Sequence, residues 1–376
     1  MSSNSESLAI SSIEIWPIDI GLNEPFVISQ GRMSAAENLF VKVTLKNGSF
    51  GFGEIAPFPD LTGENRASCL IVAERISKDL LNLGFPVTRY RAMSRELLGM
   101  EPSFAAVRCG LETAIIDSLC RDAGIPMWAL WGGADVRARI IDVTIPIASV
   151  ERSVDMARSW YSKGFRIFKT KVGIDVDDDI RRLAAIDHSL NDVAFIVDAN
   201  QGFSESDALF FARSVKKAGC NLLLFEQPLV KDDLEGMASL KNALDTPIGA
   251  DESVLTVEDA KSIIDADAAD VINLKIMKSG VIATLDIAAL TRMSGLQLMI
   301  GGMIETRVAM GCSLSIVLGL GGIKILDLDT PLLMTDDPVV GGYEYTGPSV
   351  GIWKGPGLSM RPKLDLAHTG IRVQRS

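Results

Sequence analysis

The sequence predicts an α/β protein built on a modified TIM-type (β/α) barrel with an appended α+β domain. Apolar runs of strand length recur through the second part of the chain, with amphipathic segments between them. The first part has a different order, in which extended segments come before helical ones. Charged side chains follow five of the apolar runs at intervals of 24 to 28 residues. This interval is the length of a strand with its crossover helix.

The N-terminal domain is predicted to span residues 1–135. Residues 13–45 alternate apolar and polar side chains, and the Asn47-Gly48 pair that follows them is typical of a hairpin turn. Residues 66–124 have the apolar periodicity of helices. We therefore expect an antiparallel sheet followed by helices.

The barrel is predicted to span residues 136–332. Eight segments have the composition of buried strands, and eight is the number of strands in a TIM-type barrel. They are residues 140–147, 165–172, 193–200, 221–228, 246–253, 269–276, 297–303 and 325–329. The Gly- and Pro-rich residues 333–376 are too irregular for another strand and helix, so we expect them to return to the first domain.

Composition argues against several classes of protein. The chain has 376 residues and a net charge of −11, whereas nucleic acids and anionic membranes require clustered Lys and Arg. No apolar stretch is long enough to cross a bilayer, and no signal-peptide pattern opens the sequence. The five scattered cysteines lack the spacing of disulfide or metal sites. We expect a cytoplasmic protein with a small-molecule partner.

Acidic side chains end three successive predicted strands, in the motifs Asp198-Ala-Asn, Glu226-Gln-Pro and Asp251-Glu-Ser. Any one of them alone would be expected to cap a helix or face solvent. The C-terminal ends of barrel strands meet at one mouth, however, and three converging carboxylates repel each other unless a cation binds them. Oxygen ligands without neighbouring His or Cys favour Mg²⁺. The pattern predicts one magnesium ion per subunit.

Lysines end two other predicted strands. Lys169 and Lys171 are two residues apart and share one face of the second strand, and Lys275 lies on the sixth. The alternative is that these lysines extend to solvent. Two bases on opposite faces of one carbon, Lys171 and Lys275, would remove and return a proton, and magnesium would stabilise the enediolate. We assign Lys278 to the following loop.

Asp327 and Asp329 share one face of the eighth predicted strand. They are either turn residues before Thr330-Pro331 or acceptors for a cation, and their spacing does not decide between the two. If they face the barrel mouth, they can bind a substrate ammonium. A substrate with a carboxylate at one end and an amine at the other is a dipeptide.

These residues resemble the enolase superfamily, and within it the muconate lactonizing enzyme subgroup. The resemblance covers nearly the whole chain and implies an enolase-like barrel whose capping domain comes from both chain ends. It also implies a homo-oligomer, because members often form dimers or octamers. The implied roles are magnesium ligation by Asp198, Glu226 and Asp251, proton transfer by Lys171 and Lys275, and polarisation of the substrate carboxylate by Lys169.

The Asp-Leu-Asp motif before TPLLM and the stretch LMIGGMIETR are similar to those of dipeptide epimerases. The similarity implies that Asp327 and Asp329 hold the substrate α-ammonium and that Met303 and Ile304 contact the substrate. Ala-Glu epimerases pair the substrate side-chain carboxylate with an arginine of the capping domain, and Arg32 lies at about that place. If Arg32 has this role, the substrate is L-Ala-D/L-Glu; if it points away, the substrate is another L-Ala-Xaa or a hydrophobic dipeptide.

The predicted activity is therefore a magnesium-dependent dipeptide epimerase that inverts the α-carbon of the C-terminal residue. The alternatives in the same subgroup are an o-succinylbenzoate synthase, a muconate cycloisomerase and an N-acylamino acid racemase. Their substrates carry no free ammonium, and two aspartates would repel a dianion. A catalytically inactive barrel kept for binding is the alternative from another class, and the complete set of ligands and bases argues against it.

Overall fold

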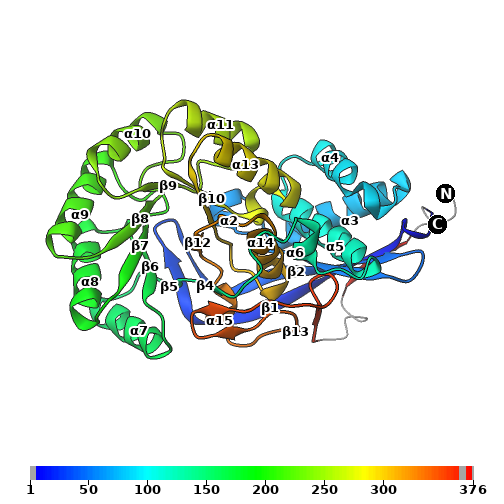
Figure 1. The fold of residues 1–376 in the computed structure, drawn as a ribbon, viewed down its shortest axis with the longest axis horizontal. Coiled ribbons are helices and arrows are strands. Elements are labelled where there is room, and N and C mark those ends of the chain that lie inside the picture. The colour runs from blue at the N-terminus through cyan, green and yellow to red at the C-terminus, as the bar shows by residue number, and fades with distance from the viewer. Residues whose placement is uncertain (1–5, 364–369, 375–376) are drawn as a thin grey trace.

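The computed structural model describes residues 6–363 and 370–374. Its larger part is an eight-stranded parallel sheet in the order β12-β11-β10-β9-β8-β7-β6-β5, which curls into the predicted barrel (Figure 1). Asp142 donates its backbone N–H to the carbonyl oxygen of Leu326 over 3.2 Å, so the first strand lies beside the last. The strands are β5 (Val143–Ile145), β6 (Ile167–Lys171), β7 (Ala194–Asp198), β8 (Leu222–Glu226), β9 (Ile248–Ala250), β10 (Val271–Leu274), β11 (Gln297–Ile300) and β12 (Ile325–Leu326).

Helices connect these strands along the outside of the barrel (Figure 1). Several begin with a side-chain cap, in which Ser149, Asp175 and Ser204 accept backbone N–H groups of the first turn. The helices are α7 (Val150–Ser162), α8 (Val176–Ser189), α9 (Glu205–Lys217), α10 (Leu234–Ala243), α11 (Val257–Asp265), α12 (Ile276–Ser279), α13 (Val281–Met293) and α14 (Arg307–Leu320).

The second layer is an antiparallel sheet, in the order β17-β1-β2-β3, with helices packed against it. Its edge strand β17 comes from the C-terminal part of the chain and pairs with β1. The strands are β1 (Ile10–Ile28), β2 (Gly31–Leu45), β3 (Phe50–Ile55) and β17 (Ile371–Gln374), and the longer helices are α3 (Arg66–Leu83), α4 (Tyr90–Met100) and α5 (Ala105–Asp122). The predicted order of strands followed by helices is confirmed.

Short elements complete the described chain. They are α2 (Pro59–Thr62), η1 (Val87–Arg89), α6 (Met127–Leu130), β4 (Arg139–Ile140), α15 (Thr330–Leu333), β13 (Val339–Gly341), β14 (Tyr345–Thr346), β15 (Ser349–Val350) and β16 (Met360–Pro362). β4 corrects the prediction that the first barrel strand begins at residue 140. Its residues pair with β15 instead, outside the barrel, and the barrel strand begins at Val143.

The long hairpin of β1 and β2 carries the capping sheet to the mouth of the barrel (Figure 1). Its tip is fixed there by hydrogen bonds to the loops that follow barrel strands. The Ser29 hydroxyl donates to the carbonyl oxygens of Ala199 and Asn200 over 2.9 and 2.8 Å, and Ile147 donates its N–H to the carbonyl of Val27 over 3.1 Å. The hairpin tip therefore forms one wall of the barrel mouth.

A buried carboxylate joins the capping sheet to the barrel. Glu54 of β3 is fully buried and accepts hydrogen bonds from the backbone N–H and hydroxyl of Thr306 and from the N–H of Ala309. These donors belong to the first turn of α14, where a helix has no internal acceptors. Asn38 donates to the same carboxylate over 2.8 Å. Glu54 thus acts as a helix cap supplied by another domain.

We expect Glu54→Ala to lower the free energy of unfolding by at least about 3 kcal/mol, because several buried donors lose their acceptor. Urea denaturation followed by circular dichroism measures this. The matched control is Glu96→Ala on an exposed position of α4, which should change the free energy by less than about 0.5 kcal/mol. Equal stability of the two variants would contradict the capping role.

Candidate active site

Three buried carboxylates lie together at the C-terminal ends of neighbouring strands. Asp198 ends β7 and Glu226 ends β8, and the two residues are direct partners in the sheet register. Asp251 follows β9 immediately. All three are 0% exposed, and one oxygen atom from each lies within 4.8 Å of the others. The structure therefore brings together the three residues that the sequence singled out as metal ligands.

The three lysines that the sequence singled out lie against these carboxylates. Lys169 Nζ lies 3.0 Å from Asp198 Oδ2, 2.8 Å from Glu226 Oε2 and 2.7 Å from Asp327 Oδ2. Lys171 Nζ lies 2.6 Å from Asp198 Oδ2, and Lys275 Nζ lies 2.7 Å from Asp251 Oδ2. Each ammonium group thus occupies a position where it neutralises the carboxylates.

Burial and these ion pairs shift the pKa values of the site in opposite directions. Burial alone would raise the pKa of Asp198, but Lys169 and Lys171 lower it to about 2. Burial and then the charge of Asp198 raise the pKa of Glu226 to about 7. Burial lowers the pKa of Lys275, but Asp251 raises it more, so the net pKa lies above its ordinary value. The neighbouring ammonium groups therefore balance the three carboxylates in this structure.

The donor set fits a magnesium ion. It consists of carboxylate oxygens without sulfur or imidazole, which is the chemistry that hard divalent cations prefer. The Oε2 atom of Glu226 is fully buried and, apart from its ion pair with Lys169 at 2.8 Å, accepts no hydrogen bond within the described chain. Asp198, Glu226 and Asp251 are the residues that would hold the ion.

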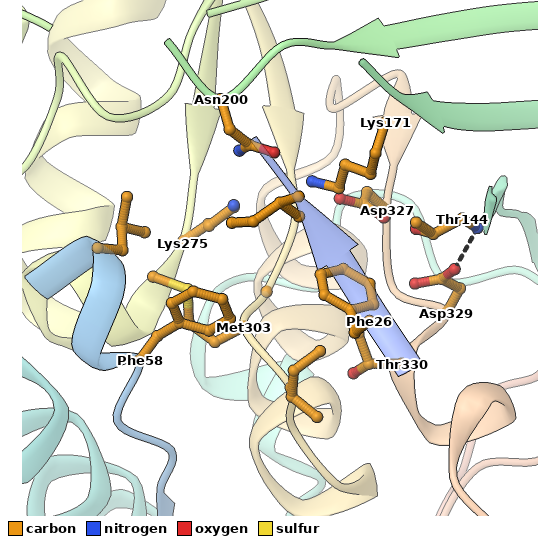
Figure 2. Close-up of a pocket in the computed structure, with 14 residues that line it drawn as sticks. Phe26, Phe58, Thr144, Lys171, Asn200, Lys275, Met303, Asp327, Asp329 and Thr330 are labelled. Atoms are coloured by element: carbon orange, nitrogen blue, oxygen red, sulfur yellow. Dashed lines mark hydrogen bonds between the residues drawn. The ribbon is translucent and has the colours of Figure 1, made fainter. Parts of the chain in front are cut away.

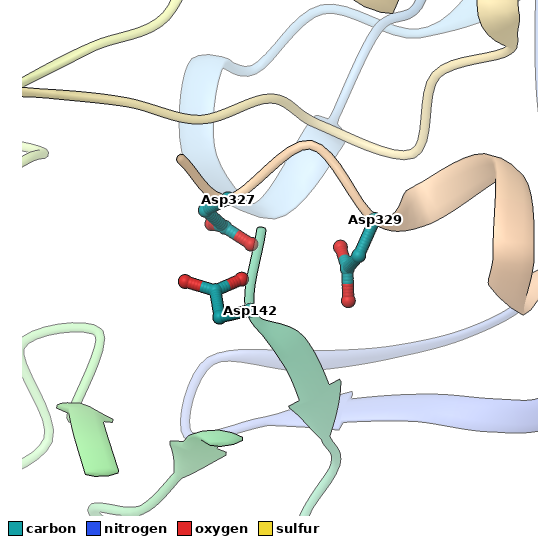
Figure 3. Close-up of side chains that lie close together, drawn as sticks. All are labelled: Asp142, Asp327 and Asp329. Carbon is teal, nitrogen blue, oxygen red and sulfur yellow. The ribbon is translucent and has the colours of Figure 1, made fainter. Parts of the chain in front are cut away.

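A second acidic cluster is linked to the first through Lys169, whose Nζ also contacts Asp327. Asp142, Asp327 and Asp329 are buried and each contributes an oxygen within 4.8 Å of the others (Figure 3). Asp329 Oδ2 accepts the backbone N–H of Thr144 over 2.5 Å, whereas neither oxygen of Asp142 accepts a hydrogen bond. Burial and then Asp327 raise the pKa of Asp329 to about 7, and the same causes raise that of Asp142. This cluster is suited to a cation.

One cavity is lined by two residues of the second cluster and by two of the lysines that contact the first (Figure 2). Its polar side carries Lys171 and Lys275 together with Asp327 and Asp329. Its other side is apolar and is formed by Phe26, Ile28, Phe58, Leu61, Met303 and Ile304. Four of these apolar residues belong to the capping domain. The barrel therefore supplies the charged side chains of the cavity, and the capping domain supplies most of its apolar surface.

Arg32 lies outside this cavity. It is exposed and lines a separate pocket with Glu24 and Val27, its partner in the hairpin register. Side chains alternate between the two faces of a strand, and here Phe26 and Ile28 face the cavity. Val27 and Arg32 consequently lie on the opposite face of the hairpin.

Several residues of the site were not predicted. Lys278 was assigned to a loop, but it is buried in α12 and its Nζ lies 2.6 Å from Asp251 Oδ1. Its spacing of three residues from Lys275 is the signal that could have indicated a shared helical face. Asn273 Nδ2 donates to Glu226 Oε1 over 2.6 Å. Asp142 lies two residues before Thr144 and could have been noticed by the same alternation as Lys169 and Lys171.

Comparisons with known proteins agree with this geometry. A family model described as "Enolase C-terminal domain-like" matches residues 152–366. An L-Ala-D/L-amino acid epimerase from Populus trichocarpa is 39% identical over 90% of this chain and 81% of its own length. An aromatic dipeptide epimerase from Herpetosiphon aurantiacus is 37% identical over 90% of this chain and 94% of its own length.

Solved structures show the same architecture. A dipeptide epimerase from Cytophaga hutchinsonii, complexed with Mg and the dipeptide D-Ala-L-Val, superposes with a TM-score of 0.93 at 27% identity. The match covers 97% of this chain and 100% of that one. Among the helices of residues 6–363, none is long and apolar enough to cross a membrane. From the matched family model and from relatives above 30% identity, the chain belongs to the enolase superfamily and is an isomerase of its epimerase and racemase group.

Proposed function

We propose that the protein is a magnesium-dependent dipeptide epimerase that inverts the α-carbon of the C-terminal residue of L-Ala-Xaa, where Xaa is apolar. The observation that carries the proposal is the single cavity in which two lysines, an aspartate pair and an apolar wall face one space (Figure 2). These three groups match the three parts of such a dipeptide. The lysines match the acidic α-carbon, the aspartates match the free ammonium, and the apolar wall matches the side chain.

The two lysines supply the proton transfers. Lys171 ends β6 and Lys275 follows β10, and both ammonium groups reach into the cavity from different strands (Figure 2). When bound, magnesium supplies positive charge beside the substrate carboxylate and so increases the acidity of the α-carbon. One lysine removes the α-proton in its neutral form, and the other delivers a proton to the opposite face. The reverse order converts the other epimer.

The aspartates define the amino end of the substrate. Asp327 and Asp329 line the cavity, and Asp142, whose carboxylate accepts no hydrogen bond, lies close to both of them. A free ammonium is attracted by this negative cluster. An N-acylamino acid or a dianionic succinylbenzoate precursor brings no positive charge, so its binding leaves the repulsion uncompensated.

The side-chain subsite is assigned to apolar groups. Phe26, Phe58 and Met303 contribute apolar surface to the cavity, and Arg32 lies on the other face of the hairpin. A substrate glutamate would have to bury its carboxylate without a cationic partner from Arg32, which is costly. The relative named an aromatic dipeptide epimerase supports the same assignment.

The first test is incorporation of deuterium from D₂O into a panel of L-Ala-L-Xaa dipeptides, measured by mass spectrometry with Mg²⁺ present. We expect exchange at the C-terminal α-carbon of L-Ala-L-Leu and L-Ala-L-Phe, because the apolar wall binds their side chains. Removal of the metal with EDTA should stop the exchange. Exchange of N-acetyl-L-Leu without exchange of any dipeptide would contradict the proposal.

A second prediction concerns Arg32. Since its side chain does not reach the cavity, Arg32→Ala should leave the ratio of kcat/KM for L-Ala-L-Leu over L-Ala-L-Glu within about twofold of the wild-type value. Phe26→Ala is the contrasting variant, and it should lower kcat/KM for L-Ala-L-Leu by about tenfold through lost apolar contact. A large change of the ratio in Arg32→Ala would instead place this arginine in the substrate site.

A further inference from the structure

Each of the three carboxylates at the metal site has one oxygen held by a fixed neighbour. Asp198 Oδ1 accepts the backbone N–H of Asn200 over 3.0 Å. Glu226 Oε1 accepts Nδ2 of Asn273 over 2.6 Å, and Asp251 Oδ1 accepts Nζ of Lys278 over 2.6 Å. Two of these neighbours, Asn273 and Lys278, do not line the cavity, whereas Asn200 does.

The remaining oxygen of each carboxylate meets only lysine ammonium groups. Asp198 Oδ2 lies 2.6 Å from Lys171 Nζ, and Asp251 Oδ2 lies 2.7 Å from Lys275 Nζ. Glu226 Oε2 accepts no hydrogen bond and lies 2.8 Å from Lys169 Nζ. A cation can replace an ammonium at these three oxygens without breaking the fixed hydrogen bonds. The structure thus offers one free oxygen per ligand.

Lys278 differs from the other lysines of the site. It is 3% exposed and does not line the cavity, whereas Lys171 and Lys275 do. Its ammonium donates to Asp251 Oδ1, to the Asp251 carbonyl and, over 3.2 Å, to the Asn273 carbonyl. An ammonium has three N–H donors, so its capacity is used by these three acceptors. Lys278 is therefore built into the scaffold of the site.

We infer that Asn273 and Lys278 are positioning residues that restrict Glu226 and Asp251 to one ligand oxygen each, and that the site thereby selects Mg²⁺ over Ca²⁺. Ca²⁺ takes 6 to 8 oxygens and often binds both oxygens of one carboxylate, whereas Mg²⁺ requires octahedral geometry with single oxygens and water. Blocking the second oxygen penalises Ca²⁺ selectively. The inference depends on the divalent metal site alone and not on the substrate.

The test is isothermal titration of the metal-free protein with MgCl₂ and, separately, with CaCl₂. The informative quantity is the ratio of the Ca²⁺ Kd to the Mg²⁺ Kd, because removing the positive charge of Lys278 changes the affinity for both divalent ions. In Asn273→Ala and in Lys278→Met a carboxylate oxygen becomes free. We expect the ratio to fall by about tenfold in each, the lower end of the usual effect of such outer partners on metal affinity.

The matched control is Asn38→Ala. Asn38 is also buried and donates its Nδ2 to a carboxylate, that of Glu54, over 2.8 Å, but this carboxylate is not at the metal site. The ratio should therefore remain at the wild-type value. Circular dichroism verifies folding, and if Lys278→Met does not fold, the uncharged change Asn273→Ala decides the question alone. An unchanged ratio in folded Asn273→Ala overturns the inference, whatever the outcome of the dipeptide assays.

Discussion

The ion pairs between buried carboxylates and lysines at the barrel mouth are the interaction on which the rest of the structure depends. Asp198, Glu226 and Asp251 are fully buried, and isolated burial of one carboxylate is prohibitively costly. The parallel barrel permits their burial because consecutive strand ends bring Lys169 and Lys171 into the same space. The same ion pairs thus provide the reactive groups and stabilise the interior of the barrel.

The capping domain completes this arrangement. The hairpin tip covers the mouth with Phe26 and Ile28, which keeps water from the ion pairs and strengthens them. Glu54 fixes the cap to α14, next to the loop that carries Met303 and Ile304. The barrel accordingly provides the reacting groups, while the cap and this loop provide the surface that meets the substrate side chain.

The fold and the charged centre could be predicted from the sequence because each follows from local pattern. A residue directly after a buried strand must lie at the mouth of a parallel barrel, so Asp198 or Lys171 needs no long-range information. Whether Arg32 faced the cavity depended on the register of the hairpin. The register shifts between Gly21 and Phe26, so alternation read from the earlier part of β1 does not extend to the tip.

Other features depended on contacts between distant segments. Glu54 caps a helix that begins 253 positions later, at Arg307, and nothing in the sequence around it indicates this partner. Lys278 lies within an apolar run whose short helix could not be distinguished from a loop by periodicity. Asp142 has its partners in the last barrel strand and the turn after it, which meet the first strand only when the barrel closes.

The most direct test of the central claim follows α-proton exchange in D₂O separately for the two epimers of L-Ala-Leu, with the Lys171→Ala and Lys275→Ala variants loaded with Mg²⁺. Each variant retains one base on one face. The account predicts that neither variant epimerises the dipeptide, and that each exchanges the α-proton of a different epimer. Exchange of the same epimer by both variants, or continued epimerisation by either, would contradict a mechanism with two lysines on opposite faces.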